Sequence, residues 1–261
     1  MSDELQLDLS DKGVLSITMN RPEVHNAFDD HQIRRFTTAL EDARDNPAVR
    51  VVVVAGTGTN FSAGGDINYL RRMGDNPYEE NLADGGQLAR LMQTLNFFPK
   101  PTIARVKGAA MGGGVGLVSC CDFAIGTANT KLALTEVKLG MVPATISPYV
   151  VMTIGEKAAR RLFMSGQAVR GEEARRLGFL SELVAEEELD AAVAALADTL
   201  LKNAPQAVAL AKQLAIEVAA GDISQAMITE TVKLIADVRD SDEGREGLSA
   251  FLEKRPASWL N

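Results

Sequence analysis

The chain has 261 residues, enough for one large domain or for one domain with an appendage. Hydrophobic residues make up 46% and charged residues 24%, which is ordinary for a soluble globular protein. The net charge of −8 argues against nucleic acid or an anionic membrane surface as a partner, because both require basic patches.

The N-terminal segment and the cysteines indicate the compartment. Residues 1–13 contain no apolar stretch of signal-peptide length, and no run of about 18 apolar residues occurs anywhere. Cys120 and Cys121 are adjacent, a spacing that rarely forms a disulfide, and no metal-ligand pattern accompanies them. We therefore expect buried thiols in a reducing cytoplasm, without a signal peptide or a membrane span.

Strand patterns alternate with helix patterns through the first two thirds of the chain. Apolar and β-branched runs predict strands at 14–20, 49–56, 101–108, 123–128 and 131–134. Helical spacing of apolar residues predicts helices at 29–46, 77–97 and 149–166. A strand, a glycine-bearing loop and a helix recur at least three times without a fixed sequence period, which indicates a repeated architecture.

From about residue 168 the chain becomes alanine-rich and helical. Gly178, Pro205 and Gly221 punctuate this part, and no long linker precedes it. We therefore expect the helical tail to pack on the α/β core or on a neighbouring subunit. The chain divides into a core of residues 1–200 and a C-terminal helical region of residues 201–261.

Two glycine-rich loops carry the strongest chemical signal. Residues 61–66 (FSAGGD) and 111–116 (MGGGVG) each follow an apolar strand and precede a helix. Amides at a helix start lack intrahelical partners, and glycine lets a ligand approach them closely. Two such loops on neighbouring repeats would direct two N–H donors at one carbonyl oxygen, as in an oxyanion hole. The alternative is that the glycines only permit tight packing of strand against helix.

Glu136 is the candidate acid or base, since it follows a short strand among glycine and apolar residues. A carboxyl group held there would have a raised pKa and exchange protons near neutral pH. The alternative is a solvated glutamate paired with Lys138. His25 and His31 could hold a metal, but His31 is expected at an exposed helix start, so we expect no metal site.

Five segments then combine into one specific pattern: NRPEVHNAF, FSAGGDI, KPTIARVKGAAMGGGVGL, CDFAIG and the closing FLEKRP. Their order and spacing resemble the crotonase family, also called the enoyl-CoA hydratase/isomerase family, over nearly the whole chain. The resemblance implies an α/β fold, a crotonase-like spiral of ββα repeats with a C-terminal helical trimerisation region. It also implies acyl-CoA thioester substrates, no cofactor beyond the substrate's coenzyme A, and a homotrimer or a dimer of trimers.

The resemblance also assigns residues. Gly65 and Gly113 would supply the two N–H groups of the oxyanion hole, and Glu136 the general acid and base. Phe251 and Lys254 resemble a C-terminal pair that closes over CoA, often from a neighbouring subunit. The remaining contacts with CoA are expected at Glu23, Val24, His25, Ala63, Asp66, Ile67 and Asn68.

One departure from the family bears on the reaction. Relatives with two catalytic glutamates carry the second one where this chain has Gly116. A hydratase of this sequence must therefore use Glu136 for both the water and the α-proton, or recruit another residue. A Δ3–Δ2 enoyl-CoA isomerase needs only one carboxylate and would also fit, as would a catalytically inert acyl-CoA binder.

The segment ATISPYVV (144–151) favours one kind of substrate. With GGGVGLVSCCDFAIG it resembles bacterial methylglutaconyl-CoA and isohexenylglutaconyl-CoA hydratases, whose substrates carry a second carboxylate. Arg71 and Arg72 are candidates to bind that carboxylate, although a pair of surface arginines is the simpler reading. The sequence thus favours an acyl-CoA hydratase that acts on a branched, α,β-unsaturated thioester of the glutaconyl type.

Overall fold

The structure, a computed structural model, describes residues 4–260, so residues 1–3 of the N-terminal segment and Asn261 lie outside it. Its strands are β1 (Leu5–Leu9), β2 (Val14–Met19), β3 (Val51–Gly56), β4 (Thr102–Val106), β5 (Ala109–Met111), β6 (Phe123–Thr127), β7 (Lys131–Ala133), β8 (Ala168–Arg170) and β9 (Glu182–Val184). Its α-helices are α1 (Asp30–Asp45), α2 (Ile67–Asp75), α3 (Tyr78–Asn96), α4 (Gly113–Cys120), α5 (Ser147–Ser165), α6 (Gly171–Leu177), α7 (Leu189–Leu201), α8 (Pro205–Ala219), α9 (Gln225–Asp240) and α10 (Asp242–Glu253). Its short 3-10 helices are η1 (Pro22–Val24), η2 (Glu136–Leu139), η3 (Glu186–Glu188) and η4 (Ser258–Leu260).

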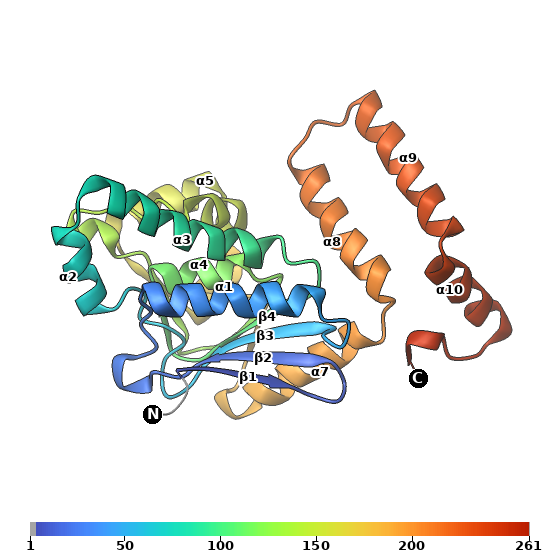
Figure 1. Cartoon of the computed structure of the whole chain (residues 1–261), viewed down its shortest axis with the longest axis horizontal. Coiled ribbons are helices and arrows are strands. Elements are labelled where there is room, and N and C mark those ends of the chain that lie inside the picture. Colours follow the sequence, from blue (N-terminus) through green and yellow to red (C-terminus); the bar gives the residue numbers. More distant parts are fainter. Residues whose placement is uncertain (1–3, 261) are drawn as a thin grey trace.

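A six-stranded sheet in the order β1-β2-β3-β4-β6-β9 forms the frame of the fold. β1 and β2 pair antiparallel, and the later pairs are parallel. Alternate residues of β3 face opposite sides: Val52 and Val54 join the cluster that includes α1 and α3, whereas Val51 and Val53 pack with α7. Figure 1 shows α1 and α3 covering one side of the sheet. Because both faces are covered, the sequence of β3 is a continuous apolar run.

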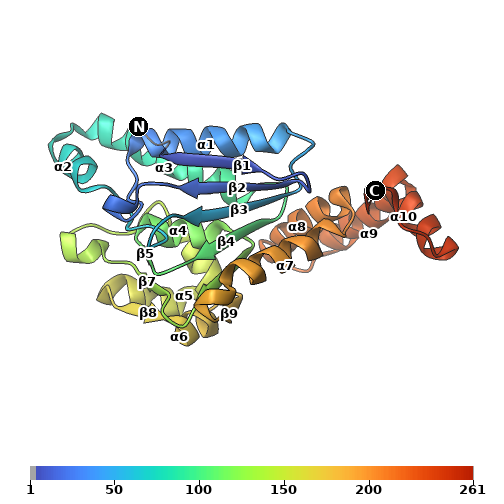
Figure 2. The same cartoon turned by 90° about the horizontal axis from the view of Figure 1, so that it is seen from below.

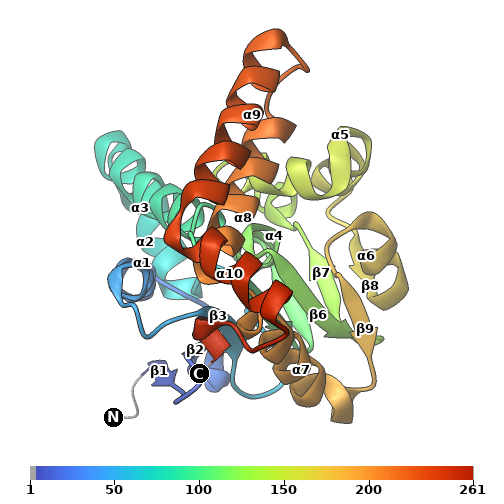
Figure 3. The same ribbon diagram turned by 90° about the vertical axis from the view of Figure 1, so that its right-hand side faces the viewer.

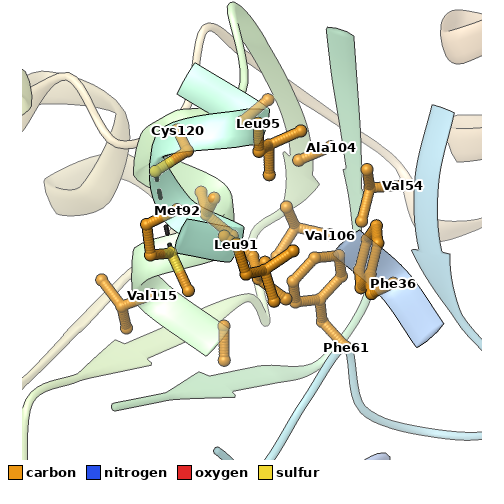
Figure 4. Close-up of a cluster of buried hydrophobic side chains, with 14 of the residues drawn as sticks. Phe36, Val54, Phe61, Leu91, Met92, Leu95, Ala104, Val106, Val115 and Cys120 are labelled. Carbon is orange, nitrogen blue, oxygen red and sulfur yellow. Dashed lines mark hydrogen bonds between the residues drawn. The ribbon is translucent and has the colours of Figure 1, made fainter. Parts of the chain in front are cut away.

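The larger core lies between the sheet, α1, α3 and α4 (Figure 4). Three side chains meet there: Phe36 of α1, Leu91 of α3, and Phe61 from the loop after β3. None of them is more than 3% exposed. Beside them the sulfur atoms of Met92 on α3 and Cys120 on α4 lie 3.7 Å apart. Burial of each large apolar side chain contributes about 1.5–3 kcal/mol, so this packing fixes α4 firmly against α3.

A three-stranded sheet, β5-β7-β8, brings the second glycine loop close to Glu136. β5 leads into α4 beside β7 (Figure 2), and the two strands pair in parallel with Met111 opposite Ala133. The amide of Gly112 then donates a hydrogen bond to the carbonyl of Ala133 over 2.9 Å. Parallel neighbours end at the same edge of a sheet, so the residues that follow β5 and β7 lie together.

The last helices project from the rest of the chain. Figure 1 shows α8, α9 and α10 extending away from the sheet, and Figure 3 looks directly onto them. α9 presents Ile228, Val232 and Ile235 at helical spacing, 46%, 61% and 47% exposed. The division at residues 200 and 201 stays a prediction, although α7 ends at Leu201. Across residues 4–260, no helix has both the length and the apolar character that spanning a membrane requires.

The expected α/β class is confirmed, and each strand or helix predicted above has a counterpart close to its predicted bounds. Two local differences have physical causes. The strand expected at 101–108 ends at Val106, because the chain turns at Gly108 with a φ of +65° and begins β5 in the second sheet. The helix expected at 149–166 begins two residues earlier, at Ser147, and is kinked at Gly155 with a φ of +75°.

Candidate active site

The first glycine loop lies between β3 and α2. Gly64 has a φ of +85°, a conformation that favours glycine, and Gly65 stands directly before Asp66, the N-cap of α2. A short parallel bridge ties the loop to Phe28: the amide of Phe28 donates to the carbonyl of Gly64 over 2.8 Å. The amide of Gly65 donates to no residue within the described range 4–260.

The second glycine loop joins β5 to α4. Gly112 is the N-cap of α4 with a φ of +48°, and Gly113 is the first helical residue. The amide of Gly113 thus belongs to the first turn of a helix, where N–H groups have no intrahelical acceptor. No acceptor for it exists among the residues that the structure describes. The structure therefore confirms that both glycines lie at the start of a helix.

The two loops lie side by side. A second bridge pairs Ser62 with Ala110, and the amide of Met111 donates to the carbonyl of Ser62 over 2.9 Å. A Cβ placed on Gly64 would lie 2.7 Å from the carbonyl oxygen of Met111 and 3.6 Å from the nitrogen of Gly113. This close approach requires glycine at position 64. It brings two unpartnered amide groups, those of Gly65 and Gly113, to one place.

Glu136 stands at the start of η2, beside the second loop. Its Oε2 is buried and has no hydrogen-bond partner in the described part of the chain. A Cβ on Gly112 would lie 3.1 Å from Oε1, so a larger residue there would press on the carboxyl group. Burial raises the pKa of Glu136, because it removes water from the charged form, and this outweighs the lowering by a hydrogen bond from the backbone of Glu136 itself. The carboxyl group can therefore exchange protons closer to neutral pH than an exposed glutamate.

One cavity of about 280 Å³ is lined by Gly65, Gly113 and Glu136 together. Its wall is mostly apolar and comes from the two glycine loops, α1, α2, α3 and the segment after η2. The lining residues are Phe28, Ile33, Ala63, Gly64, Gly65, Tyr69, Leu70, Met73, Asp84, Gly85, Leu88, Met111, Gly112, Gly113, Thr135, Glu136, Leu139, Met141, Val142, Pro143, Ala144, Thr145 and Ile146. Sites for small organic groups have this character, with a few polar groups in an apolar hollow.

The place of the absent second glutamate is filled. A Cβ on Gly116 would lie 2.4 Å from Cγ2 of Ile146 and 3.1 Å from Sδ of Met92. Ile146 belongs to the segment ATISPYVV and is itself 2% exposed. A side chain at position 116 therefore has no room, because Ile146 and Met92 occupy the space that it would need.

The residues expected to hold CoA lie on two adjacent loops. Glu23 and His25 are exposed, and the carbonyl of His25 accepts a hydrogen bond from the amide of Ala63 over 2.9 Å. Ala63 lines the cavity, whereas Ile67 and Asn68 are exposed in the first turn of α2. The two loops are thus adjacent beside the cavity, and the contacts of these residues with CoA stay a prediction.

Asp66 has a structural role in addition to the one expected. Its carboxylate accepts hydrogen bonds from the amides of Asn68 and Tyr69, and it pairs with Arg21 over 2.9 Å. Burial acts to raise its pKa, but the two amides and Arg21 outweigh burial and lower it. Val24 is half-buried in η1. The expected contacts of Val24 and Asp66 with CoA stay predictions.

Four other expected residues lie outside the cavity wall. Arg71 donates to the side chain of Asn68, and Arg72 pairs with Asp30 over 2.8 Å. Phe251 is 80% exposed on α10, and Lys254 follows that helix with a φ of +55°. α2 and α10 lie at opposite ends of the chain (Figure 1). Phe251 and Lys254 are therefore far from the cavity of the chain to which they belong.

The sequence reading missed two polar residues in the wall. Tyr69 of α2 donates its hydroxyl hydrogen to Asp84 of α3 over 2.5 Å, and both residues line the cavity. A signal for Asp84 exists, because it lies four residues before Leu88 on the inward face of the predicted helix. A charged residue on an apolar face indicates a buried polar contact. Nothing local indicates Tyr69 as its partner.

No group of three or more His, Cys, Asp or Glu side chains within residues 4–260 is arranged to hold a metal ion. His25 instead lies 3.1 Å from the side-chain amide of Asn60 through its Nδ1. That this chain works without a metal or redox cofactor stays a prediction.

Comparison with known proteins identifies the family. The profile of the family described as "Enoyl-CoA hydratase/isomerase" matches residues 10–261. The crystal structure of an enoyl-CoA hydratase from Shewanella pealeana has a TM-score of 0.95 with 40% identity, covering 98% of this chain and 96% of that chain. A crotonyl-CoA hydratase of Syntrophomonas wolfei is 33% identical over 93% of both chains, and the 2,3-dehydroadipyl-CoA hydratase of Escherichia coli K12 is 29% identical over 93% of both.

This chain therefore belongs to the enoyl-CoA hydratase/isomerase family. The fold expected from the sequence, that of the crotonases, is confirmed. The expected enzyme class, an enoyl-CoA hydratase-type lyase, is confirmed as well.

Proposed function

We propose that this chain adds water across the double bond of an α,β-unsaturated acyl-CoA thioester. One arrangement carries the proposal: the unpartnered amides of Gly65 and Gly113 share an apolar cavity with the buried carboxyl group of Glu136. The amides stabilise negative charge on the thioester oxygen. Glu136 takes a proton from water and returns it to the α-carbon. Coenzyme A enters as part of the substrate.

The acyl group that we propose is branched and of the glutaconyl type, with a second carboxylate. Segment 144–151 supports this by its resemblance to glutaconyl-type hydratases. The E. coli relative named for 2,3-dehydroadipyl-CoA supports it too, since an adipyl chain also ends in a carboxylate. Arg71 and Arg72 are the proposed partners of that carboxylate, because on α2 they adjoin the cavity-lining residues Leu70 and Met73. Replacing either arginine by alanine should raise KM for 3-methylglutaconyl-CoA but not for crotonyl-CoA.

The CoA moiety is proposed to bind along the loops at 23–25 and 63–68. Phe251 and Lys254 would close over it from a second copy of the chain, since they lie far from their own cavity. This requires an assembly, and we propose a homotrimer or a dimer of trimers. We propose a cytoplasmic location, which agrees with two cysteines that form no disulfide.

One observation favours a second candidate, a Δ3–Δ2 enoyl-CoA isomerase. Ile146 fills the space beside Gly116, so no acid can stand where two-glutamate relatives place one. A single carboxylate is sufficient to move one proton between two carbon atoms. Glu136 could then remove the α-proton of a 3-enoyl thioester and return it to the γ-carbon.

An assay with three substrates separates these functions. Purified protein is offered 3-methylglutaconyl-CoA, crotonyl-CoA and 3-hexenoyl-CoA, and products are followed by absorbance of the conjugated thioester and by mass. Loss of conjugation with gain of one water supports the hydratase. Movement of the double bond of 3-hexenoyl-CoA with no water added to any substrate would replace the hydratase by the isomerase.

Glu136→Gln distinguishes an enzyme from an inert binder. The amide keeps the size of the side chain but cannot accept and return a proton. We expect kcat to fall by about 10²–10⁴-fold, the usual contribution of a general acid or base. CoA affinity, measured by calorimetry, should stay unchanged. A wild-type chain that binds CoA thioesters but turns over none of the three substrates would be an inert binder.

A further inference from the structure

A second polar cluster lies in the wall of the same cavity. The hydroxyl of Tyr69 donates to Oδ2 of Asp84 over 2.5 Å, and the two residues are 7% and 9% exposed. They come from different helices, α2 and α3. Among the lining residues, which all belong to the described range, Tyr69, Asp84 and Glu136 are the only ionisable side chains. If the reaction uses a second acidic group, this pair is the one that the cavity offers.

The carboxylate of Asp84 receives one hydrogen bond, from Tyr69, and has capacity for another. Within residues 4–260 it has no lysine or arginine partner, although burial of a carboxylate is costly without compensation. Tyr69 satisfies Oδ2, and no described residue donates to Oδ1. Asp84 lines the cavity, so a water molecule or an O–H group of a substrate held there can donate to Oδ1. An ionised carboxylate accepts hydrogen bonds and donates none, which selects for a donor at this point.

Tyr69 is held so that it remains a donor. Burial raises the pKa of its hydroxyl group, and the hydrogen bond to Asp84 raises it further. The guanidinium of Arg72 lies over the ring at 5.8 Å from its centre, and Arg72 is itself paired with Asp30. The ring is therefore fixed from one side by a cation and at its end by Asp84. Rotation of the Asp84 carboxylate away from the cavity would break this bond.

A second hydrogen-bond acceptor beside Glu136 would orient the attacking water. As water attacks, one of its hydrogens passes to Glu136, and the other must be oriented so that the oxygen lone pair points at the β-carbon. Two-glutamate relatives can place a second acid from position 116, where this chain has Ile146 against the glycine. Asp84 comes from α3, whose residues Asp84 and Leu88 line the same cavity as Glu136 on one helical face.

We propose that Asp84, held in place by Tyr69, accepts a hydrogen bond from the attacking water and is the second polar group of hydration. This inference rests on the proposed hydratase function. The water O–H bond breaks toward Glu136, the oxygen bonds to the β-carbon, and the π electrons pass into the thioester enolate. Glu136 then returns the proton to the α-carbon, and the carbonyl re-forms. Asp84 orients the water throughout and neither gains nor loses a proton.

The experiment compares two reactions that share Glu136 but differ in their need for water. Hydration of crotonyl-CoA requires both groups. Exchange of the α-proton of butyryl-CoA in heavy water requires only Glu136 and the oxyanion amides, because no water adds to carbon. Asp84→Asn should lower kcat for hydration by about 100-fold, as misplacement of a reacting group does, and leave exchange at the wild-type rate. Glu136→Gln should lower both by about 10²–10⁴-fold.

Matched controls exist on the same helices. Asp75→Asn removes an exposed carboxylate at the end of α2, and should change neither reaction. For the positioning residue, Tyr69→Phe should lower kcat for hydration by about tenfold with KM unchanged, whereas Tyr78→Phe, at a side chain 74% exposed, should have no effect. Tyr69→Phe combined with Asp84→Asn should be no slower than Asp84→Asn alone, because the tyrosine acts through the aspartate.

Each outcome decides between distinct explanations. Hydration unchanged in Asp84→Asn overturns this inference and leaves the hydratase function intact. Hydration and exchange that fall together in Asp84→Asn assign it a structural role and also overturn it. A loss confined to substrates with a polar acyl chain would make Asp84 a specificity residue instead. A wild-type chain that exchanges the α-proton but hydrates no enoyl thioester overturns the hydratase function itself.

Discussion

At Glu136, burial opposes the charged form of the carboxyl group more strongly than the hydrogen bond from its own backbone favours that form. Its Oε2 is enclosed without a partner in the described chain, and burial raises its pKa above the ordinary value of 4.5. Water attack requires the carboxylate form, since only that form accepts a proton. The cost of burying the charge thus brings the pKa closer to the pH at which the group must exchange protons.

The pH dependence of the rate follows from this direction. Because the pKa is raised, Glu136 becomes protonated at a higher pH than an exposed glutamate, and activity is lost as pH falls through that raised value. We expect the acid limb of kcat/KM for crotonyl-CoA to lie above pH 4.5. Rate measurements across the stable pH range check this. A limb at or below the ordinary glutamate value would contradict the assignment.

A substitution at Gly116 tests the packing of the cavity wall, because it adds a methyl group and no functional group. An added methyl group would lie 2.4 Å from Cγ2 of Ile146, a β-branched side chain that cannot rotate away freely. We expect Gly116→Ala to lower the free energy of unfolding by about 1–3 kcal/mol, as overpacking does. The control is Gly86→Ala on α3, where a Cβ meets nothing within 4 Å. That change should instead stabilise by about 0.5–1 kcal/mol in urea unfolding.

At the scale of elements, α2 depends on its first residues. Asp66 caps it, pairs with Arg21, and follows Gly65 directly. Gly65 directly precedes this cap and Tyr69 lies in the first turn after it, and both residues line the cavity. Any loosening of this cap would move the amide of Gly65 and the Tyr69–Asp84 contact together.

Asp66→Asn isolates the charge at this cap, because asparagine is also a good N-cap. Loss of a charged hydrogen bond to Arg21 should cost about 1.5–3 kcal/mol at neutral pH. The folded pKa of Asp66 is lowered, so its contribution is present above the unfolded pKa, near 3.8, and is lost as pH falls through the folded value. Urea unfolding should show the difference between wild type and variant narrowing in acid. Asp75→Asn should show no such difference at any pH.

The glycine loops, α1, α3 and Glu136 could be predicted because their signals are local. Caps, apolar periodicity and strand–glycine–helix order are properties of adjacent residues. The Tyr69–Asp84 contact could not be predicted, since it depends on how α2 and α3 meet. β5 and β8, with three residues each, are too short to show a pattern, and only their neighbours make them strands. Ile146 against Gly116 is likewise a contact across 30 positions of sequence, visible only once α4 and α5 are packed.

At the scale of the whole molecule, the exposed apolar residues gather on the projecting helices. Ile228, Val232 and Ile235 form a stripe along α9, and Phe251 and Leu252 are 80% and 76% exposed on α10. Large exposed apolar surfaces of this kind mark interaction sites. They lie on the part of the chain that carries the proposed CoA contacts Phe251 and Lys254.

Assembly and CoA affinity should therefore change together. Val232→Glu places a charge in the centre of the α9 stripe, and we expect it to convert the oligomer to a monomer in light-scattering measurements. KM for crotonyl-CoA should rise in the same variant, because Phe251 and Lys254 no longer reach a second copy. Met164→Glu, at a residue 72% exposed on α5, is the control and should change neither. A wild-type chain that is already monomeric would contradict the proposed assembly.

The contact between Ile146 and Gly116 also constrains how this family member can change over generations. A glutamate introduced at position 116 would meet the isoleucine before it reached the substrate. A second glutamate at position 116 would therefore require a smaller residue at position 146. Packing thus sets the order of the two substitutions, with position 146 changed before position 116.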